Sequence, residues 1–243
     1  MPALAVSGLA KHDRADFAQE FLRRSTAYRA AWAAARGSPE SGDAVALARR
    51  WGLIRLFDPD RPVRLAPAIW RADCASQVVS LAIAPAGFAG AAALPGVAPT
   101  AEYRLDGTRH LVFDIAGARH RFAVRDPRDG ALAILLPPLG TGLRTAACDA
   151  ARRMFAGASI AEPMRVLRPS ALQRQRLTLL LRVLDASLAG ASNREIGTRI
   201  VYPWLAGTDA LAWKAMSERR RVQRLIDEAR GLASSAYRDL LIA

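Results

Sequence analysis

Cysteine is nearly absent from this chain of 243 residues, in which only Cys74 and Cys148 carry a thiol. Two cysteines cannot build a disulfide framework, and these two do not have the spacing of metal ligands. Such usage is typical of a protein of the reducing cytoplasm. The sequence also lacks a heptad run, a long repeat and an acidic or basic tail, which excludes a coiled coil, a solenoid and a charged tail.

Long hydrophobic runs are missing as well. The longest uncharged stretch runs from Cys74 to Ala101, but Pro85, Pro95 and Pro99 interrupt it. A transmembrane helix needs roughly twenty strongly apolar residues without such breaks. The opening MPALAVSGLA has no basic segment and is followed at once by charged residues, so we expect no signal peptide. The sequence therefore predicts a cytoplasmic protein that has no membrane partner.

Lysine is scarce, and arginine supplies almost all of the positive charge. Lys11 and Lys214 are the only lysines, yet the formal net charge is +13. Residues 165–243 hold fourteen of the 35 basic residues but only seven of the 22 acidic ones. A basic excess of this kind attracts polyanions in a salt-sensitive way. About half of the residues are apolar, which is enough for one large core or two modest ones.

Residues 1–70 predict a helical module followed by a connector. Asp16 and Gln19 have the spacing of a helix-capping pair. Aromatic residues follow at helical spacing and indicate a small core, namely Phe17, Phe21, Tyr28 and Trp32. Ser38 followed by Pro39 predicts a second helix start, and Gly52 its end. Three prolines make residues 52–70 an extended connector.

Residues 71–160 predict an antiparallel β-meander with one helix. Single strands are expected at residues 78–83 and 132–136. A helix is expected after the second of these strands, and Gly157 would end it. Asp106-Gly107 is a strong signal for a two-residue hairpin turn, and Ala116-Gly117 is a weaker one.

The second hairpin turn also predicts the register of its strands. Three pairs would share the apolar face, namely Leu111 with Phe122, Phe113 with His120, and Ile115 with Ala118. Asp114 would then lie opposite Arg119 on the other face, where the two side chains can form an ion pair.

Residues 161–243 predict an all-helical domain. Ser170 with Gln173 and Ser192 with Glu195 have capping-box spacing, so each pair predicts a helix start. The first of these helices has a leucine line and ends at Gly190, and the second is the short segment NREIGTRI. The final helix starts either near Asp209 or at Ser217, and we favour Ser217 as its cap.

The final helix carries the pattern on which the functional prediction depends. Its apolar residues follow the 3–4 spacing of one buried stripe, namely Val222, Leu225, Ile226, Ala229, Leu232 and Ala233. Arg220 and Arg224 point away from that stripe, Arg221 lies on its flank, and Arg219 lies closer to it. A solvated helix usually interleaves acids with its arginines, but none stands between Arg219 and Arg224.

These arginines have the placement expected of a helix that enters the major groove of DNA, where N-terminal residues reach the base edges. Arg220, Arg221 and Arg224 would then contact guanines or phosphates. The short helix before it would lie across the backbone and bind phosphate with residues at its start, namely Ser192, Asn193 and Arg194. Gly197 would let two helices cross closely.

The sequence gives less support to the hypothesis of a catalytic function. His110 and His120 suggest a metal pair, but the hairpin register places His120 on the apolar face and no third ligand is evident. The GTG at 140–142 precedes a helix without the Lys and Ser/Thr of a phosphate loop. We therefore expect no enzyme, no metal site and no cofactor. A metal-dependent nuclease stays an alternative that a metal assay would test.

Three segments resemble a known family. Residues 179–197 and 213–241 resemble the C-terminal variant helix-turn-helix domain of a proteobacterial activator family. That family includes FseA-like activators of conjugative-element transfer and RovC-like activators of type VI secretion genes. The run DFAQEFLRRSTAYRAAW, residues 16–32, is similar to the helical module at the front of such activators.

The resemblance implies sequence-specific promoter binding, oligomerisation, no catalysis and, in some relatives, an antiactivator partner. It implies that Trp213 plugs the core and that basic residues contact DNA at four matching positions, namely Lys214, Arg219, Arg221 and Arg224. The chain differs from its relatives at Glu218, where they tend to be apolar, and at Arg220, where an acid is common.

Together these observations predict an α+β protein with three parts, at residues 1–70, 71–160 and 161–243. We expect a cytoplasmic, oligomeric regulator that binds double-stranded DNA through the third part, where Ser217 also belongs to the contact set. The other parts would serve assembly or contact with RNA polymerase. The alternative is an antiactivator-type interaction module, whose arginine face would meet an acidic protein partner.

Overall fold

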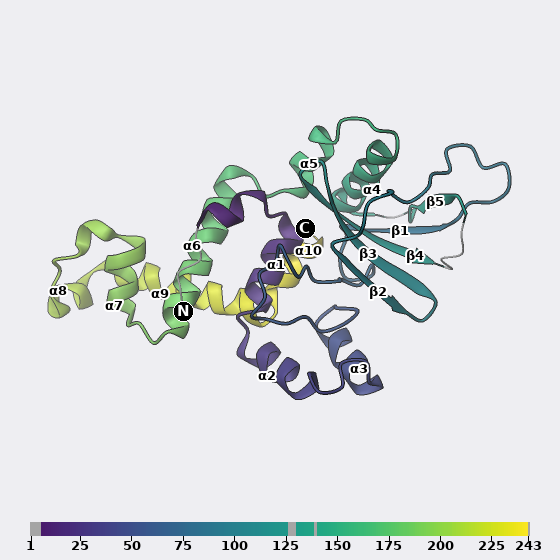
Figure 1. The fold of residues 1–243 in the computed structure, drawn as a ribbon. Coiled ribbons are helices and arrows are strands. Elements are labelled where there is room, and N and C mark those ends of the chain that lie inside the picture. Colours follow the sequence, from purple (N-terminus) through teal and green to yellow (C-terminus); the bar gives the residue numbers. More distant parts are fainter. Residues whose placement is uncertain (1–5, 126–129, 139, 243) are drawn as a thin grey trace.

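The computed structural model describes residues 6–125, 130–138 and 140–242. Figure 1 shows an elongated molecule with a sheet and its covering helices at one end and a group of helices at the other. Helices from the N-terminal part of the chain lie between these two ends. The protein is therefore α+β, with helices before and after the sheet in sequence.

The N-terminal helices are α1 (Arg14–Leu22), α2 (Thr26–Ala35) and α3 (Gly42–Arg50), preceded by a short 3₁₀ turn. The first predicted start is wrong by one turn, because Asp13 caps α1 and Asp16 closes the capping box from inside the helix. The start predicted at Ser38 and Pro39 is also wrong. Ser41 caps α3, since its hydroxyl accepts the amide N–H of Ala44.

The connector between α3 and the sheet is not the extended segment that the sequence predicted, because it folds into turns at residues 59–60 and 63–65. Leu53 and Trp70 form an isolated β-bridge, and both side chains are buried. Tyr28 of α2 donates a hydrogen bond to the carbonyl oxygen of Phe57 (2.8 Å) and stacks on its ring. These contacts bind the connector to the N-terminal helices.

The sheet has five strands in the order β2-β3-β4-β1-β5. Their bounds are β1 (Val78–Ile83), β2 (Ala101–Leu105), β3 (Thr108–Ile115), β4 (Ala118–Arg125) and β5 (Leu132–Leu135). Both hairpin turns are present, with positive φ at Asp106-Gly107 and at Ala116-Gly117. The β3–β4 register is the predicted one, including the ion pair of Asp114 with Arg119 at 2.9 Å.

The prediction of an antiparallel meander is wrong for the rest of the sheet. β1 lies between β4 and β5, and it pairs with β4 in parallel and with β5 antiparallel. A turn signal predicts pairing only between two strands that follow each other directly in the sequence. The loop after β1 and the β2–β3 hairpin separate β1 from β4 in the sequence, so no such signal predicts their pairing. The sheet is therefore mixed.

One face of the sheet is covered by α4 (Gly142–Phe155) and α5 (Ala161–Leu167). The apolar pairs of the hairpin, among them Leu111 and Phe122, share a core with Leu143 and Ala147 of α4. α4 ends at Gly157 as predicted. The sequence analysis did not anticipate α5, which has no side-chain cap.

The C-terminal helices are α6 (Ala171–Leu188), α7 (Asn193–Ile196), α8 (Ala210–Ala215), α9 (Ser217–Ser234) and α10 (Asp239–Ile242), with a π-helical turn directly after α7. Both predicted capping boxes are present, at Ser170 and at Ser192. Ser217 is not the cap, because α9 starts one residue earlier than that role requires. Met216 holds the cap position and Ser217 is the first helical residue. Asp209 does start a helix, but the separate helix α8.

The two ends of the chain share one hydrophobic core. α1 packs against α9 and α10, and its Phe17 and Phe21 belong to the same buried cluster as Leu181 and Val222. Arg24, just after α1, also pairs with Asp185 of α6 at 2.6 Å. The N-terminal helices therefore contribute to the hydrophobic core against which the C-terminal helices pack.

A buried ion cluster joins α1 to the sheet. The guanidinium of Arg121 on β4 lies 2.6 Å from Asp13 and 2.8 Å from Asp16, and all three residues are buried. Arg119 adds a second contact to Asp16 at 2.9 Å. Burial by itself raises the pKa of Asp13, but the charge and hydrogen bonds of Arg121, the amide of Asp16 and the charge of Arg119 together lower the pKa of that carboxyl group. A buried ion pair of this kind is costly to break, because one charge is left without a partner.

Candidate nucleic-acid interface

The apolar stripe of α9 faces the protein interior. Val222, Leu225, Ile226, Ala229 and Ala233 are buried, and Leu232 is half-buried. The stripe packs mainly against α6 and α1. This packing fixes the orientation of α9, so the opposite face of the helix must point to solvent.

That opposite face carries the predicted arginines. Arg219, Arg220, Arg221 and Arg224 are all exposed. In the part of the chain that the structure describes, none of them forms an ion pair with a carboxylate. The acids nearest in sequence have other partners, since Glu218 accepts a hydrogen bond from Ser217 and Asp227 accepts one from Gln223. The four guanidinium groups are therefore available to an external anion.

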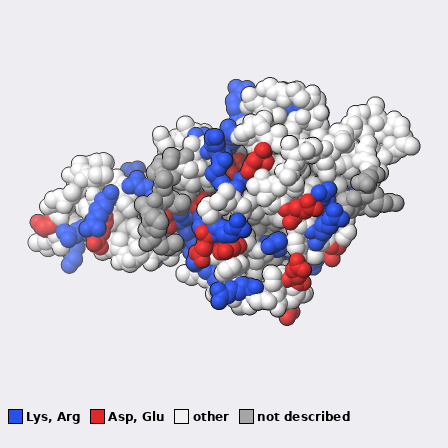
Figure 2. Space-filling view, viewed as in Figure 1, with Lys and Arg blue, Asp and Glu red and all other residues white. Residues whose placement is uncertain are grey.

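The start of α9 adds further groups that attract anions to the surface formed by these arginines. Met216 at the cap position offers no side-chain acceptor, so the first backbone N–H groups of α9 have no side-chain cap. Lys214 and Ser217 are exposed beside them, and the Arg219 guanidinium donates to the carbonyl oxygen of Lys214 at 3.4 Å. Figure 2 shows basic side chains, with a few acidic ones among them, on the outer end of the molecule where α7, α8 and α9 meet.

The residues predicted at α7 are more engaged in internal contacts. Ser192 uses its hydroxyl within its capping box with Glu195. The side-chain amide of Asn193 donates to Gln223 of α9 at 3.1 Å, which links the two helices. Arg194 is exposed, and one of its nitrogens donates to the carbonyl oxygen of Thr208 at 3.0 Å. Arg194 is thus the most accessible of the three.

A basic residue that the prediction omitted lies nearby. Arg199, in the π-helical turn after α7, has 77% of its side chain exposed and lies 3.9 Å from Glu195. Arg199 follows Glu195 by four residues, the spacing of an ion pair within a helix, and the sequence analysis did not include it.

Gly197 explains how α7 and α8 fit together. Trp213 of α8 is buried, and its indole lies directly on Gly197. A Cβ atom at Gly197 would lie 2.8 Å from Cζ2 and 3.2 Å from Cζ3 of that ring, and closer still to Cη2. The close approach predicted at Gly197 is therefore present, and its partner is the indole of α8. Trp213 holds α8, and with it the start of α9, against α7.

The two histidines considered as metal ligands lie on different faces of the sheet strands and are both buried. His120 stacks on Phe122 with ring centroids 6.4 Å apart, and burial together with the charge of Arg121 lowers its pKa to about 4. Burial also lowers the pKa of His110. Among the described residues, no three metal-ligating side chains gather in one place, and no described helix is long and apolar enough to cross a membrane.

Two protein-family models match parts of this chain. Residues 127–241 match the family model described as the DNA-binding domain of the RovC transcription factor of the type VI secretion system (T6SS). The family resemblance is confirmed. Residues 4–54 match a proteobacterial transcriptional regulator-like domain. Together the two matches support a DNA-binding transcriptional regulator, and neither describes an enzyme.

The RovC-type match includes all of the C-terminal helices as well as β5, α4 and α5. The second match covers α1, α2 and α3. No match was found among curated proteins or among solved structures.

Proposed function

We propose that this protein is a sequence-specific transcriptional regulator that places the N-terminal half of α9 in the major groove of DNA. The observation that carries the proposal is the exposed face of α9, whose arginines pair with no described carboxylate, opposite a stripe packed on the protein's own core. Such a helix is held to its domain on one side and offers charge to a duplex on the other. The family match gives independent support.

The spacing of the arginines gives the expected footprint. Arg220 and Arg224 are four residues apart, so they lie about 6 Å apart along the helix axis. This distance corresponds to roughly two base-pair steps of 3.4 Å. A guanidinium can donate two hydrogen bonds to O6 and N7 of guanine. We therefore expect Arg220, Arg221 and Arg224 to reach base edges or phosphates within one short half-site.

Contacts to the phosphate backbone would come from both sides of α9. Lys214, Ser217 and Arg219 lie at its start, where the uncapped N–H groups also favour an anion. Arg194 and Arg199 of the α7 segment lie on the neighbouring edge and would contact the next phosphates. In this arrangement α7 and α9 act as the two helices of a variant helix-turn-helix.

The biological role follows from the family as a proposal. The RovC-type domain supports regulation of type VI secretion genes, and the resemblance to FseA-like proteins supports conjugative-element genes as the other candidate class. We propose that the protein is an activator and acts as an oligomer. A single α9 reads too few base pairs for a specific site, so repeated half-sites would be needed.

Selection of binding sites from random DNA duplexes tests the proposal. Full-length protein should enrich a defined sequence, and genome-wide mapping should place that sequence at promoters. An interaction module with an acidic protein partner would enrich none. In gel shifts, Arg221→Ala and Arg224→Ala should each weaken binding by about 1–3 kcal/mol. Arg61→Ala removes the same charge from the exposed connector and serves as the control.

If both α9 variants bound the selected duplex as tightly as the Arg61→Ala control, the placement of α9 in the groove would be wrong. Binding by the full-length protein with no sequence preference would instead overturn specific regulation while keeping a role in non-specific DNA binding.

A further inference from the structure

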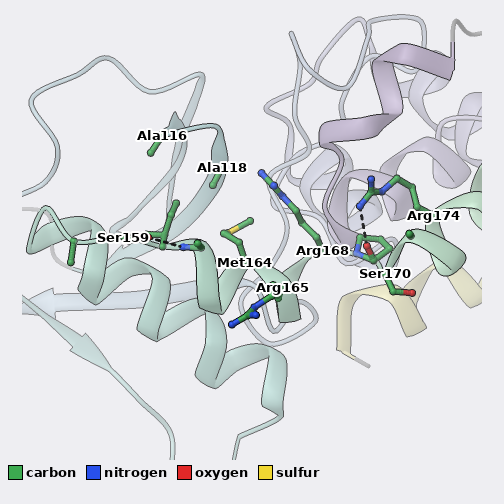
Figure 3. A pocket seen from close by; sticks show the side chains of 13 residues that line it. Ala116, Ala118, Ser159, Met164, Arg165, Arg168, Ser170 and Arg174 are labelled. Atoms are coloured by element: carbon green, nitrogen blue, oxygen red, sulfur yellow. Dashed lines mark hydrogen bonds between the residues drawn. The ribbon is translucent and has the colours of Figure 1, made fainter.

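A second basic surface lies at the other end of α6, in a groove between three elements. Residues of the β3–β4 turn form one wall, the loop before α5 and α5 itself form the floor, and the first turns of α6 form the other wall. The groove has a volume of about 770 Å³, within the range of small-molecule sites in proteins. Figure 3 shows Arg168 between Ala118 and Arg174, with Met164 beside it.

The lining of this groove combines apolar side chains with positive charge. Ile160, Met164 and Pro169 provide apolar surface together with several alanines, and the charged residues are Arg165, Arg168 and Arg174. No Asp or Glu lines it. Glu162 on the same helix α5 is directed elsewhere, since it pairs with Arg153 of α4 at 2.9 Å. Three arginines that line a groove without an acid among its described lining residues favour an anionic ligand.

Two of these arginines are already held in position. Arg168 donates from one terminal nitrogen to the carbonyl oxygen of Gly117 at 2.6 Å, and Arg174 donates to that of Pro169 at 3.3 Å. The Nε atom of each is buried and has no hydrogen-bond partner. Arg165 is exposed and makes no hydrogen bond with a described residue.

The position of the groove separates it from the DNA-binding surface. It lies at the N-terminus of α6, and α7 follows the C-terminus of the same helix. Eighteen helical residues span about 27 Å. The positive end of the α6 dipole adds a small attraction for an anion in the groove. A bound anion would therefore occupy a place distinct from the surface of α9.

We propose that this arginine groove binds a small phosphate ester whose other part is apolar or aromatic. The phosphate would accept hydrogen bonds from the terminal guanidinium nitrogens of Arg165, Arg168 and Arg174. The apolar part would lie on Ile160 and Met164. A bidentate guanidinium matches the tetrahedral oxygens of phosphate better than a point charge does. A ligand here would bridge the β3–β4 turn of the sheet and the first turn of α6.

Isothermal titration of full-length protein tests the proposal with three probes, namely phenyl phosphate, inorganic phosphate and benzoate. Phenyl phosphate should bind in a one-to-one ratio and more tightly than the other two, because it alone supplies both the phosphate and the ring. Tighter binding of benzoate would overturn the choice of phosphate. Absence of binding by phenyl phosphate up to about 10 mM would overturn the site itself.

Variants assign the binding to the groove. Arg165→Ala should weaken phenyl phosphate binding at least about tenfold, since hydrogen bonds to charged groups are strong. Arg165 is exposed, so its variant should fold normally, and circular dichroism checks this. Arg165→Lys should retain part of the affinity, and Arg61→Ala should retain all of it. Equal affinity in Arg165→Ala and the wild type would show that the probe binds elsewhere.

A DNA arm distinguishes a ligand site from an extra contact to the duplex. Gel shifts with a short selected duplex should give the same affinity for Arg165→Ala as for the wild type. A loss as large as that of Arg221→Ala would make the groove a DNA-backbone contact and overturn the ligand proposal. The DNA affinity of the α9 variants is measured independently of ligand binding in the groove. Failure of the ligand proposal can therefore be distinguished from failure of the regulator function.

Discussion

The contact between Gly197 and Trp213 offers the sharpest test of how the fold positions α9. Gly197→Ala would place a methyl group where the indole of Trp213 lies, 2.8 Å from Cζ2 and 3.2 Å from Cζ3. Because Trp213 is buried, the ring has little room to move. Overpacking of this kind costs about 1–3 kcal/mol. Two ring atoms would lie under 3.0 Å from the new carbon, which places the cost in the upper part of this range, about 2–3 kcal/mol. Alanine is preferred over glycine in a helix by about 1 kcal/mol, so we expect a net loss of about 1–2 kcal/mol.

Thermal unfolding measures this loss directly. For a chain of this length each kcal/mol shifts Tm by about 2–4 °C, so Gly197→Ala should lower Tm by about 2–8 °C. Gly231→Ala is the matched control, because Gly231 lies inside α9 and a Cβ there meets nothing within 4 Å. That variant should raise Tm slightly through helix propensity alone.

A double-mutant cycle separates the steric cause from a local backbone effect. Gly197→Ala should cost less in a Trp213→Phe background, because phenylalanine lacks the outer ring atoms that the methyl group meets. DNA affinity should fall together with stability in the single variant, since α8 leads into α9. A Tm for Gly197→Ala equal to or above that of the wild type would refute the close packing of α7 on α8.

Three further predictions concern charge. Arg121→Met leaves Asp13 buried without an ion-pair partner and leaves Asp16 with Arg119 alone, so it should lower the free energy of unfolding in urea by about 3–5 kcal/mol; a change below 1 kcal/mol would contradict the buried cluster. Burial lowers the pKa of His120 to about 4, so the unfolded chain takes up the proton first, and Tm should fall as the pH drops from about 6.5 toward 4. His120→Phe should flatten that pH dependence, and an unchanged profile would assign it to other groups. Arg220→Ala should reduce the slope of log affinity against log salt by about one if Arg220 contacts a phosphate; an unchanged slope would place it at a base edge or away from the duplex.

Features that depend on a few neighbouring residues could be predicted from the sequence. The capping boxes at Ser170 and Ser192 and both hairpin turns are present where the sequence places them. Each depends on side chains and dihedral preferences within about four residues. The start of α1 was nevertheless predicted at the wrong residue. Asp13 and Asp16 are both residue types that cap helices, and only Asp13 has the extended backbone of a cap.

The exposed face of α9 could also be predicted, because helical periodicity separates the buried stripe from the arginines over one continuous segment. The exact start of α9 could not be predicted from the sequence. Asp209 and Ser217 both look like helix starts, and the structure uses both regions, for α8 and for α9. The break between these two helices falls at Met216, whose backbone is extended.

Local chemistry therefore determined the helices, the hairpins and the arginine face, and contacts between distant segments decided the rest. The sequence carries no local signal for the parallel pairing of β1 with β4, for the core that α1 shares with α9, or for the salt bridges from Arg121 to Asp13 and Asp16. The arginine groove likewise exists only where the β3–β4 turn meets α5 and α6. Such contacts depend on the three-dimensional approach of surfaces that are far apart along the chain, and residue spacing does not encode that approach.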